Sequence, residues 1–532
     1  MKISELFLQY AQAKGDLNIN LINNPLGNHL FQGLKIHSSS IQTGDIFIAI
    51  IGNNRNGLDF IKEALSLGAI LCVIPQGSKE QVIEKIIEQD ELQNFSKDTL
   101  LISLIEVKDT RDFVAYCSFN ITDQFNYTPL PKNIITVTGT NGKSSVSFFV
   151  GQYLTLLKIP NIVMGTLGIF ENNKKITSSL TTPDATTIAQ YLRKAYKNGI
   201  DFVIIESSSH GIEQKRIEGL NFVAAGFTNL TPDHLDYHQN MDNYYQAKKR
   251  LFSELVKTYA IINIDDFYGK KLNKECKDQN LKILTYGKQL SILQIIKIEQ
   301  LFNETKSAPY QLIHLKYQNK IYKIELNLSG DFQVYNIVCA LGLLLACGFS
   351  LNNLANLTKH ILEIQGRLNL IKQDFIKAKI FVDFAHTPNA LEQVLLTLKK
   401  ENHKKLRVVF GCGGDRDRLK RPQMGEIAYE LADAIYITDD NPRTENPETI
   451  RNEIIQGITL HSSLKPKPLY NIANRAEAIL KAVADLQVGD ILLIAGKGHE
   501  NTQIIGDQSV SFSDNAEVEK SLLKIYGDIN EN

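Results

Sequence analysis

The sequence lacks several features that assign other chains to a class. Lys and Arg together number 58, as do Asp and Glu, so no net charge favours a nucleic acid or an anionic membrane as partner. No stretch reaches the roughly 18 uncharged apolar residues that a membrane-spanning helix needs. The N-terminus, MKISELFLQYAQAKGD, carries early charges and no long apolar core, unlike a signal peptide. We therefore expect a cytoplasmic protein that binds neither membrane nor nucleic acid.

Cysteine pairs with metal-binding or redox spacing are also missing. The six cysteines, at positions 72, 117, 276, 339, 347 and 412, include no C-x-x-C pair. We interpret them as reduced, buried thiols and not as a disulfide or zinc framework. No internal repeat and no low-complexity tract is visible.

Apolar runs of strand length alternate with helical patterns through most of the chain. Because these runs are apolar on both faces, they predict an α/β fold with mostly parallel sheets covered on both sides by helices. Polar residues gather where the runs end, which is where ligands bind in open α/β sheets. The runs are FVIIE (202–206), VAAGFTN (223–229), YAIIN (259–263), KIFVDFA (379–385), RVVFGC (407–412), AIYITD (434–439) and DILLIAG (490–496).

The length predicts three or four domains at roughly 150 residues each. Runs DIFIAI and AILCVI form a separate N-terminal domain ahead of the first glycine turn, and YQLIHLKYQNKIYKIELNLSG alternates with period two, as an antiparallel hairpin does. We place the boundaries near residues 107 and 365. The predicted domains are 1–107, 108–365 and 366–532.

The stretch NIITVTGTNGKSSVSFF, residues 133–149, predicts a phosphate-binding turn between a buried strand and a helix. Gly139 and Gly142 let successive backbone N–H groups face an anion near a helix N-terminus. Lys143 adds a charge toward the terminal phosphates, and Ser144 a hydroxyl ligand for magnesium. The strict phosphate-binding motif G-x-x-x-x-G-K-[ST] is not matched, because Val137 occupies the position of its first glycine. An ordinary glycine-rich turn is the alternative.

Two later segments carry further candidate ligands. Glu206 ends an apolar run in IIESSSHG and His234 follows another in TNLTPDHLDYH; with Ser144 they could hold magnesium, although His234 could equally be a structural histidine. In YYQAKKRLF, the cations beginning at Lys248 have the pattern of a solvated helix face. A buried, neutral lysine there could instead react with carbon dioxide to form a carbamate.

Taken together, these motifs resemble the Mur ligase superfamily over roughly residues 130–515, and much more loosely over the first 107 residues. The resemblance implies three domains: a small α/β N-terminal domain, a central P-loop-type domain with a mostly parallel sheet, and a Rossmann-like C-terminal domain. The matching segments are TGTNGKSS, LTTPD, ESSSHGIEQKR, TNLTPDHLDYH, QAKK, VYN, GRLN, DFAHTP, GCGGDRDRLKRPQMG, DDNPRTENP and GKGHE.

The resemblance implies an ATP- and Mg²⁺-dependent ligase of bacterial peptidoglycan precursor synthesis, and we expect the chain to act as a monomer. In such a reaction, a substrate carboxylate attacks the γ-phosphate to give an acyl phosphate, and an incoming amine displaces the phosphate. Positioning and charge neutralisation do most of the catalytic work in phosphoryl transfer. The implied acceptor is UDP-N-acetylmuramoyl-L-alanyl-D-glutamate, and the implied amino acid is meso-2,6-diaminopimelate.

The same resemblance assigns roles residue by residue. Lys143, Lys248 and His234 would be catalytic. The metal ligands would be Ser144, Glu206, His234 and Lys248 as a carbamate. ATP would be bound by Gly139, Thr140, Asn141, Gly142, Lys143, Ser144, Ser145, Asn336, Arg367, Asp383 and His386. The UDP-sugar dipeptide would contact Ser38, Thr181, Thr182, Ser208, Gln214 and Arg216; the guanidinium of Arg216 suits an anionic substrate.

Charge favours diaminopimelate over L-lysine, because diaminopimelate carries a second carboxylate that needs a cation in its pocket. In DDNPR and GGDRDR, Arg443 and Arg416 supply cations, and in GKGHE Glu500 could bind the distal ammonium. A surface turn is the alternative for DNPR. The resemblance implies that the amino acid contacts Arg416, Asp440, Asn441, Arg443, Gly496 and Glu500.

One segment departs from the family pattern, which usually holds UDP with an Asp-Ser-Arg signature. HSSSIQTGD keeps Ser38 but has His37 and Ser39 in place of the acid and the arginine.

Two rival interpretations of the function remain. A folylpolyglutamate synthetase-like ligase would carry the glycine turn much nearer the N-terminus, and a GTPase would carry N-K-x-D, which the sequence lacks.

Overall fold

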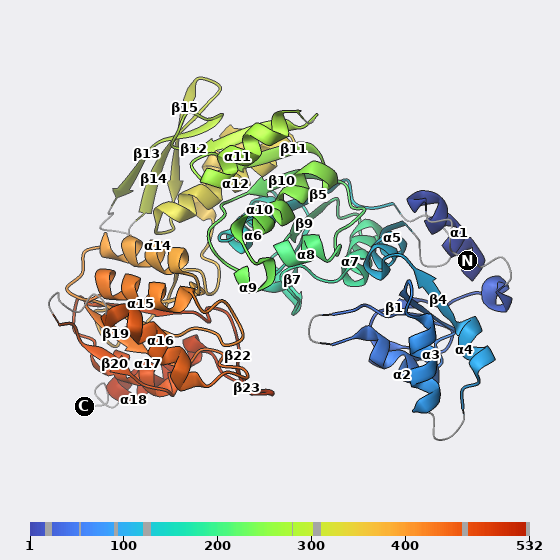
Figure 1. The fold of residues 1–532 in the computed structure, drawn as a ribbon. Coiled ribbons are helices and arrows are strands. Elements are labelled where there is room, and N and C mark those ends of the chain that lie inside the picture. The colour runs from blue at the N-terminus through green and yellow to red at the C-terminus, as the bar shows by residue number, and fades with distance from the viewer. Residues whose placement is uncertain are drawn as a thin grey trace. The chain divides into compact units, whose positions relative to one another are not determined.

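The structure is a computed structural model that describes residues 1–15, 24–52, 55–89, 94–120, 129–278, 280–301, 310–459 and 466–527. Figure 1 shows helices and strands alternating along most of the chain. Contacts divide the chain into two compact units. The first contains Met1–Thr136, Pro160–Val223 and Arg250–Lys257, and the second contains Val137–Ile159, Ala224–Lys249 and Thr258–Asn532. The domain boundaries near residues 107 and 365 stay predictions.

The N-terminal part of the first unit is a four-stranded, all-parallel sheet in the order β1-β2-β3-β4. The runs DIFIAI and AILCVI form β2 and β3, as expected, and their apolar side chains pack against the flanking helices. The elements are α1 (Ile3–Lys14), β1 (Leu34–Lys35), β2 (Ile46–Ile48), α2 (Ile61–Ser66), β3 (Leu71–Pro75), α3 (Lys79–Glu88), α4 (Lys97–Ser103), β4 (Leu104–Val107) and α5 (Thr110–Asn120).

The largest sheet has eleven strands in the order β15-β14-β13-β12-β11-β10-β5-β9-β6-β7-β8. Its pairs β6–β9, β11–β12 and β12–β13 are parallel, and antiparallel pairs extend both ends. The elements are β5 (Asn133–Thr138), α6 (Lys143–Leu156), β6 (Asn161–Gly165), β7 (Gly168–Glu171), β8 (Lys174–Thr177), α7 (Ala185–Lys197), β9 (Phe202–Glu206), α8 (Ser209–Glu213), β10 (Phe222–Phe227), α9 (Leu235–His238), α10 (Met241–Arg250), β11 (Val256–Asn263), α11 (Phe267–Glu275), β12 (Lys282–Gly287), β13 (Leu293–Leu301), β14 (Tyr310–Tyr317), β15 (Lys320–Leu326), α12 (Asp331–Ala346) and α13 (Leu351–Leu357).

The antiparallel hairpin predicted from the period-two pattern is confirmed as β14–β15. Its register pairs Tyr317 with Lys320, which leaves Gln318 and Asn319 as a two-residue turn. Both turn residues have positive φ, 48° and 61°, as a type I′ turn requires. Strand β13 pairs with β14 as well, so the hairpin is part of the large sheet.

The C-terminal part of the second unit is a six-stranded sheet in the order β16-β17-β21-β18-β19-β20, parallel except for β16. The runs predicted at 379–385, 407–412, 434–439 and 490–496 form its four central strands. The elements are β16 (Asn369–Leu370), β17 (Lys379–Asp383), α14 (Pro388–Lys399), β18 (Leu406–Phe410), α15 (Lys420–Leu431), β19 (Ala434–Ile437), α16 (Pro447–Thr459), β20 (Leu469–Asn471), α17 (Arg475–Ala484), β21 (Ile491–Ala495), β22 (Thr502–Ile505), β23 (Gln508–Ser511) and α18 (Asp514–Tyr526).

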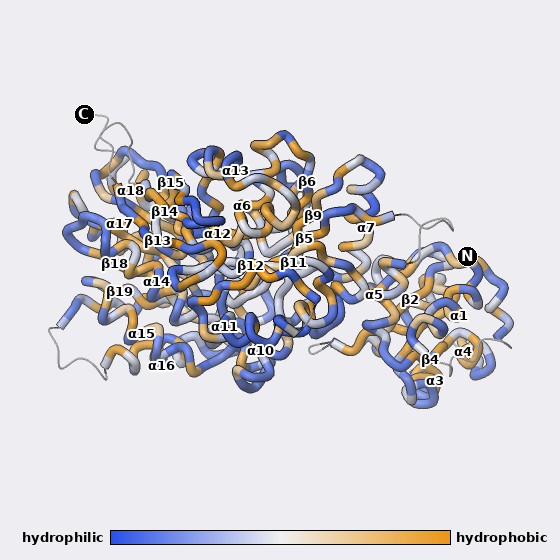
Figure 2. Tube along the Cα trace, turned by 90° about the horizontal axis from the view of Figure 1, so that it is seen from above, coloured by the Kyte–Doolittle hydropathy of each residue, from blue (hydrophilic) through white to orange (hydrophobic). Residues whose placement is uncertain are grey.

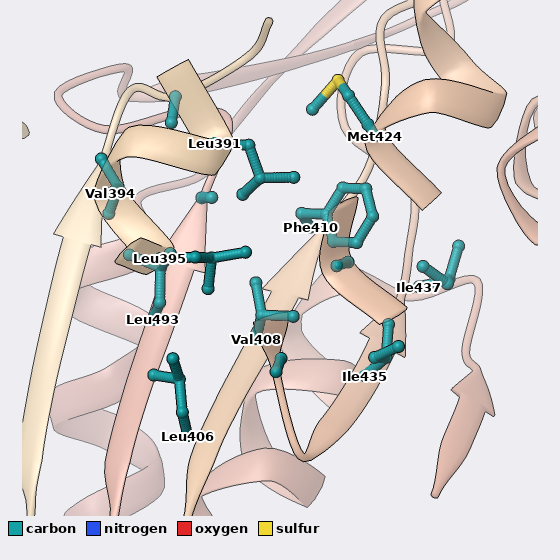
Figure 3. Close-up of a cluster of buried hydrophobic side chains, with 14 of the residues drawn as sticks. Leu391, Val394, Leu395, Leu406, Val408, Phe410, Met424, Ile435, Ile437 and Leu493 are labelled. Atoms are coloured by element: carbon teal, nitrogen blue, oxygen red, sulfur yellow. The ribbon is translucent and has the colours of Figure 1, made fainter. Parts of the chain in front are cut away.

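Helices cover both faces of this C-terminal sheet. Leu391 and Leu395 of α14 pack with Val408 and Phe410 of β18 on one face, as Figure 3 shows. Side chains of α17 and α18 cover the other face. Figure 2 shows both orange and blue turns along α15 and α16, the pattern of helices with one buried face. The predicted α/β class with mostly parallel, doubly covered sheets is therefore confirmed.

The cysteines are free thiols, as predicted: five are buried and Cys347 is partly exposed. Burial raises the pKa of these thiols, for example that of Cys276 to about 11, so they stay protonated. In the described ranges, no helix has both the length and the apolar composition needed to cross a bilayer.

Candidate functional site

The glycine turn predicted to bind phosphate connects β5 to α6, which begins at Lys143. Gly142 has φ 87°, a left-handed conformation, and a Cβ atom on it would collide with the side-chain oxygen of Asn336. A Cβ on Gly139 would collide with the hydroxyl of Thr228. Both positions require glycine, because neighbouring polar groups approach the backbone too closely for any side chain.

The side chains after the turn point back onto it. Lys143 Nζ donates to the carbonyl oxygens of Gly139, at 3.0 Å, and Thr140, at 2.8 Å. Ser144 and Ser145 are buried. Arg367, which follows β15 and α13 in the chain, donates through Nη2 to Ser144 Oγ at 3.1 Å. The GRLN segment and the glycine turn therefore meet in the second unit.

A cavity of about 470 Å³ lies beside this turn. Phe332, Tyr335 and Phe384 give it an aromatic lining, and Phe384 also packs under the guanidinium of Arg367, whose carbon lies 4.6 Å from the ring centroid. This combination of aromatic walls and a few polar groups is typical of a site for a small organic ligand. Among the residues predicted to bind ATP, the cavity is lined by Asn141, Gly142, Ser145, Asn336, Arg367, Asp383 and His386.

Asp383 and His386 from the DFAHTP segment have shifted pKa values. Burial raises the pKa of the Asp383 carboxyl to about 6, although Arg367 and hydrogen bonds from the backbone N–H groups of Leu368 and Ala385 act in the opposite direction. Those bonds measure 2.5 and 2.7 Å. Burial also lowers the pKa of His386 to about 4, so its imidazole is neutral near pH 7.

An acidic residue that the motifs did not indicate, Asp233, lies close to His386. Asp233 is buried, and its Oδ2 is 3.4 Å from Nε2 of His234 and 4.0 Å from Nε2 of His386. Burial by itself would raise the Asp233 pKa, but His234, His386, Lys420 and Lys143 together hold it below its usual range. Asp233 therefore supplies a permanent negative charge between the turn and the DFAHTP segment.

Lys420 was also missed. It lies at the start of α15, is buried, and donates from Nζ to the carbonyl oxygen of His386 at 2.9 Å. Lys420 lies in the GCGGDRDRLKRP segment, which could have drawn attention to it. The charged residues around it, however, are typical of an exposed stretch. Only packing reveals that Lys420 is buried beside His386.

For Lys248, the expectation of a solvated helix face is wrong. Its side chain is 1% exposed, its Nζ donates to Gly139 O at 2.9 Å, and the ring centroid of Tyr244 lies 4.6 Å away. Burial, reinforced by the charge of Lys143, lowers the Lys248 pKa well below its usual value. The structure therefore favours the neutral amine that carbamate formation requires, whereas the neighbouring Lys249 pairs with Glu275 at 2.9 Å.

The four predicted metal ligands are divided between the two units. Ser144, His234 and Lys248 belong to the second unit, and Glu206 belongs to the first. Glu206 is buried at the end of β9, where Oε2 accepts from the hydroxyl of Thr166 at 3.1 Å. Over the described parts of the chain, no three His, Cys, Asp or Glu side chains cluster as metal ligands. The magnesium role of the four residues stays a prediction.

The first unit contains a cavity of about 430 Å³. Ser38, Gln214 and Arg216, three of the residues predicted to bind the UDP-sugar dipeptide, line it. His37 and Ser39, the two departures from the family signature, line it as well. Three cations also line it: Arg55, Arg111 and Lys215.

The other predicted residues for this substrate lie next to Arg216. Arg216 donates from Nη1 to the carbonyl oxygen of Thr182 at 2.7 Å, and the hydroxyls of Thr182 and Ser208 are 3.0 Å apart. Thr181 Oγ1 lies 3.0 Å from Thr166 Oγ1. The LTTPD and ESSSHGIEQKR segments thus form one hydrogen-bonded group of side chains within the first unit.

The residues predicted to contact the amino acid gather beyond the carboxyl ends of β19 and β21. Asn441 Nδ2 donates to Glu500 Oε2 at 3.0 Å. Arg443 has φ 52° and donates from Nη1 to Gly414 O at 2.6 Å. Burial, followed by the nearby charge of Arg416, lowers the Arg443 pKa. The DNPR segment is therefore no free surface turn, since its side chains are bonded into the end of the sheet.

Gly496 and Arg416 complete this group. Gly496 has φ 116°, and a Cβ atom there would lie 2.7 Å from Asp440 Oδ2, so the position excludes a side chain. The Arg416 side chain is 47% exposed, with Nη1 3.9 Å from Asp236 Oδ2, so its guanidinium is accessible from solvent. The predicted amino-acid residues thus lie together in the second unit, with both signs of charge present.

Comparisons with known proteins agree with this architecture. The Mur ligase family, catalytic domain, matches residues 30–117; the Mur ligase middle domain matches residues 137–344; and the Mur ligase, glutamate ligase domain, matches residues 366–498. The three matched regions follow one another along the chain and contain the lining residues of both cavities and, except for Glu500, the charged group beyond β19 and β21.

Individual relatives extend over nearly the whole chain. A UDP-N-acetylmuramoyl-L-alanyl-D-glutamate–2,6-diaminopimelate ligase from Rickettsia prowazekii is 38% identical over 512 residues, covering 95% of this chain and 98% of its own length. A solved structure of a ligase with that name is 31% identical, with TM-score 0.63, over 100% of this chain and 99% of that one. A MurF ligase from Thermotoga maritima in complex with ADP shares the fold at 16% identity and TM-score 0.60, over 94% and 98% of the chains. The chain belongs to the Mur ligase family.

Proposed function

We propose that this chain is an ATP-dependent, ADP-forming amide ligase that joins meso-2,6-diaminopimelate to UDP-N-acetylmuramoyl-L-alanyl-D-glutamate. The relatives at 38% and 31% identity carry the name of that activity. In this proposal residues 1–107 form the UDP-sugar-binding domain, residues 108–365 the ATP-binding domain, and residues 366–532 the amino-acid-binding domain.

The single observation that carries the choice of amino acid is the mixture of charges beyond β19 and β21. Diaminopimelate ends in a carbon that bears both an ammonium and a carboxylate, whereas L-lysine ends in an ammonium alone. Arg443 is a partly buried cation that suits the distal carboxylate of diaminopimelate. Glu500 is a partly exposed anion that suits its distal ammonium. A pocket for lysine would need no cation in the position of Arg443.

The 470 Å³ cavity is the proposed nucleotide site. Its aromatic walls suit a purine, and Asn336, which lies against Gly142, suits the hydrogen-bonding edge of adenine. The phosphates would lie along the turn at Gly139–Ser145, within reach of the Lys143 ammonium once that group leaves its own loop's carbonyls. Arg367, bonded to Ser144, would hold the γ-phosphate.

The proposed reaction forms a carboxyl–phosphate bond as the bond between the β- and γ-phosphates breaks, releasing ADP. The amine of the amino acid then bonds to the acyl carbon, loses a proton and displaces inorganic phosphate. Lys143, Arg367 and Lys420 supply cations beside the charge that is transferred, and Asp383 and Asp233 keep the neighbouring groups oriented. Magnesium, when bound, would neutralise phosphate charge; its predicted ligands are Ser144, Glu206, His234 and carbamylated Lys248.

The 430 Å³ cavity of the first unit is the proposed site for the UDP part of the acceptor. The family's usual arginine is replaced by Ser39, so another cation has to meet the diphosphate. Arg111, at the start of α5, and Arg55 both line the cavity and can supply that charge. Gln214 and Arg216, which follow α8, also line the cavity and would contact the carboxylates of the dipeptide.

Phosphate release with and without each substrate tests the proposal. The purified chain should release phosphate from ATP only when UDP-N-acetylmuramoyl-L-alanyl-D-glutamate and an amino acid are both present, with diaminopimelate and L-lysine compared side by side. Equal or faster turnover with L-lysine would overturn the amino-acid assignment and leave the ligase class standing. Hydrolysis indifferent to both substrates would overturn the ligase assignment itself.

A further inference from the structure

Lys497, in the GKGHE segment after β21, is a fully buried lysine whose role is not given by the family motif. Its side chain is 0% exposed, and its Nζ contacts residues of two stretches of the chain, 440–441 and 500–502. It donates to Asn441 Oδ1 at 2.9 Å, to Thr502 O at 2.8 Å and to Glu500 Oε2 at 3.3 Å. A fourth neighbour, Asp440 Oδ1, lies 3.5 Å away.

These contacts fix which way the Asn441 amide faces. Its oxygen accepts from two donors, Lys497 Nζ and the backbone N–H of Ile504 at 3.0 Å. Because an amide oxygen and an amide nitrogen lie on opposite sides of the group, Nδ2 must face Glu500, which accepts from it at 3.0 Å. Lys497 therefore determines the donor and acceptor pattern that Asn441 presents.

The β22–β23 hairpin completes this arrangement from the other side. Gln503 Nε2 donates to the carbonyl oxygen of Asp440 at 2.7 Å, Arg443 N donates to Ile504 O at 3.1 Å, and Gly506 N donates to Arg443 O at 2.8 Å. Lys497 joins the first strand of this hairpin through Thr502 O. The DDNPR segment is thus held between the hairpin and the buried lysine.

Charge gives a second reason for a lysine at this position. Asp440 and Glu500 are two carboxylates that converge on one place, and their repulsion would push them apart without a cation between them. Lys497 contacts Oε2 of Glu500, whose side chain remains 33% exposed and open to a ligand ammonium. A buried cation hydrogen-bonded on several sides holds such a group in one geometry better than an exposed pair does.

We propose that Lys497 is a positioning residue for the incoming amino acid, acting through Asn441 and Glu500 to fix the part of the pocket that binds the distal end of the substrate. This inference rests on the proposed function of the charged group beyond β19 and β21. Lys497 itself does not touch the reacting amine or the phosphates. Its loss should therefore weaken recognition of the amino acid and leave recognition of ATP unchanged.

Steady-state phosphate release by Lys497→Met tests this assignment, because methionine fills the same volume without the donors. Losing a charged donor in a buried network predicts a KM for diaminopimelate about 10- to 100-fold higher. The KM values for ATP and for the UDP-sugar dipeptide should stay within about twofold of wild type. Lys481→Met, which removes a 43% exposed lysine paired with Asp485 in the same domain, is the matched control and should change none of the three values.

A double-mutant cycle with Glu500→Gln separates positioning from a general packing role. If Lys497 acts through Glu500, the double variant should raise the diaminopimelate KM by clearly less than the product of the two single effects. Multiplicative effects, or equal rises in the KM values for all three substrates, would overturn the assignment. If wild type itself ignores diaminopimelate, the proposed function fails; if wild type responds and Lys497→Met keeps its KM, only the positioning role fails.

Folding is checked by thermal unfolding and by binding of a non-hydrolysable ATP analogue to each variant. Lys497→Gln, which retains one polar group in the buried site, replaces the methionine variant if that protein does not fold. If neither variant folds while Lys481→Met does, Lys497 is a structural group and the positioning role is overturned.

Discussion

Replacing Gly142 with alanine should weaken nucleotide binding through a collision with one residue, Asn336. Gly142 has φ 87°, and an L-amino acid in a left-handed conformation costs about 1–2 kcal/mol. The added Cβ would also meet the side-chain oxygen of Asn336, which is buried in the wall of the 470 Å³ cavity. The unfavourable backbone conformation lowers only the stability of the fold. The collision also displaces Asn336, the residue proposed to bind adenine, and therefore lowers the affinity for the nucleotide.

The expected magnitude follows from what Asn336 would lose. Asn336 is 6% exposed, and its Nδ2 donates to Gln333 Oε1 at 3.1 Å. Displacing a buried amide from its hydrogen bonds costs about 1–3 kcal/mol. Since 1.4 kcal/mol is a factor of ten in affinity, the Kd for an ATP analogue should rise about 5- to 150-fold in Gly142→Ala.

Gly348 provides a matched control for the backbone cost. It has φ 92°, and no atom lies within 4 Å of the position that a Cβ would occupy. Both alanine variants should therefore lose about 1–2 kcal/mol of stability, seen as a lower Tm, but only Gly142→Ala should lose affinity in calorimetric titration. Equal Kd values for the two variants would refute the reasoning, because the collision with Asn336 would then have no effect on the ligand.

Two further predictions follow from the shifted pKa values. The folded pKa of His386, about 4, is below the unfolded value, so stability falls as the pH drops from about 6.5 through 4. Between pH 6.5 and 4, the free energy of unfolding in urea should fall by about 1–2 kcal/mol more for wild type than for His386→Gln. This figure is discounted for solvent screening, because the His386 side chain is 34% exposed. For Lys248, removing dissolved carbon dioxide should reduce ligase activity several-fold and bicarbonate should restore it, while Lys248→Met should be inactive under both conditions. An unchanged slope, or wild-type activity indifferent to carbon dioxide, would contradict these expectations.

The strands of the C-terminal sheet could be predicted because local sequence is sufficient for them. Runs such as RVVFGC and DILLIAG are apolar on both faces, as strands of a doubly covered parallel sheet are, and they form β18 and β21. The β22–β23 hairpin was not predicted. Its residues Gln503–Val510 lack a clear alternation, and the strands are partly stabilised by bonds to Asp440 and Arg443 from another segment.

The burial of lysine side chains could not be predicted from the sequence. Lys143, Lys248, Lys420 and Lys497 look alike in the sequence, and only Lys143 stands in a motif whose spacing explains its position. Burial of the other three depends on which segments pack over them, so a charged run such as AKKR has the same pattern whether it faces water or a core. The structure assigns Lys248 to the glycine turn, Lys420 to His386 and Lys497 to Asn441.

By itself, the sequence determined the α/β class, the glycine turn before α6, the β14–β15 hairpin and the segments whose order along the chain resembles the Mur ligases. These features depend on residues close together in the chain, where hydrophobic period and backbone conformation decide the result. The tertiary structure decided which charges are buried and which segments meet, as at Arg367 and Ser144, 223 positions apart. Such contacts depend on packing between distant elements, and no local pattern encodes the desolvation and charge pairing that follow from it.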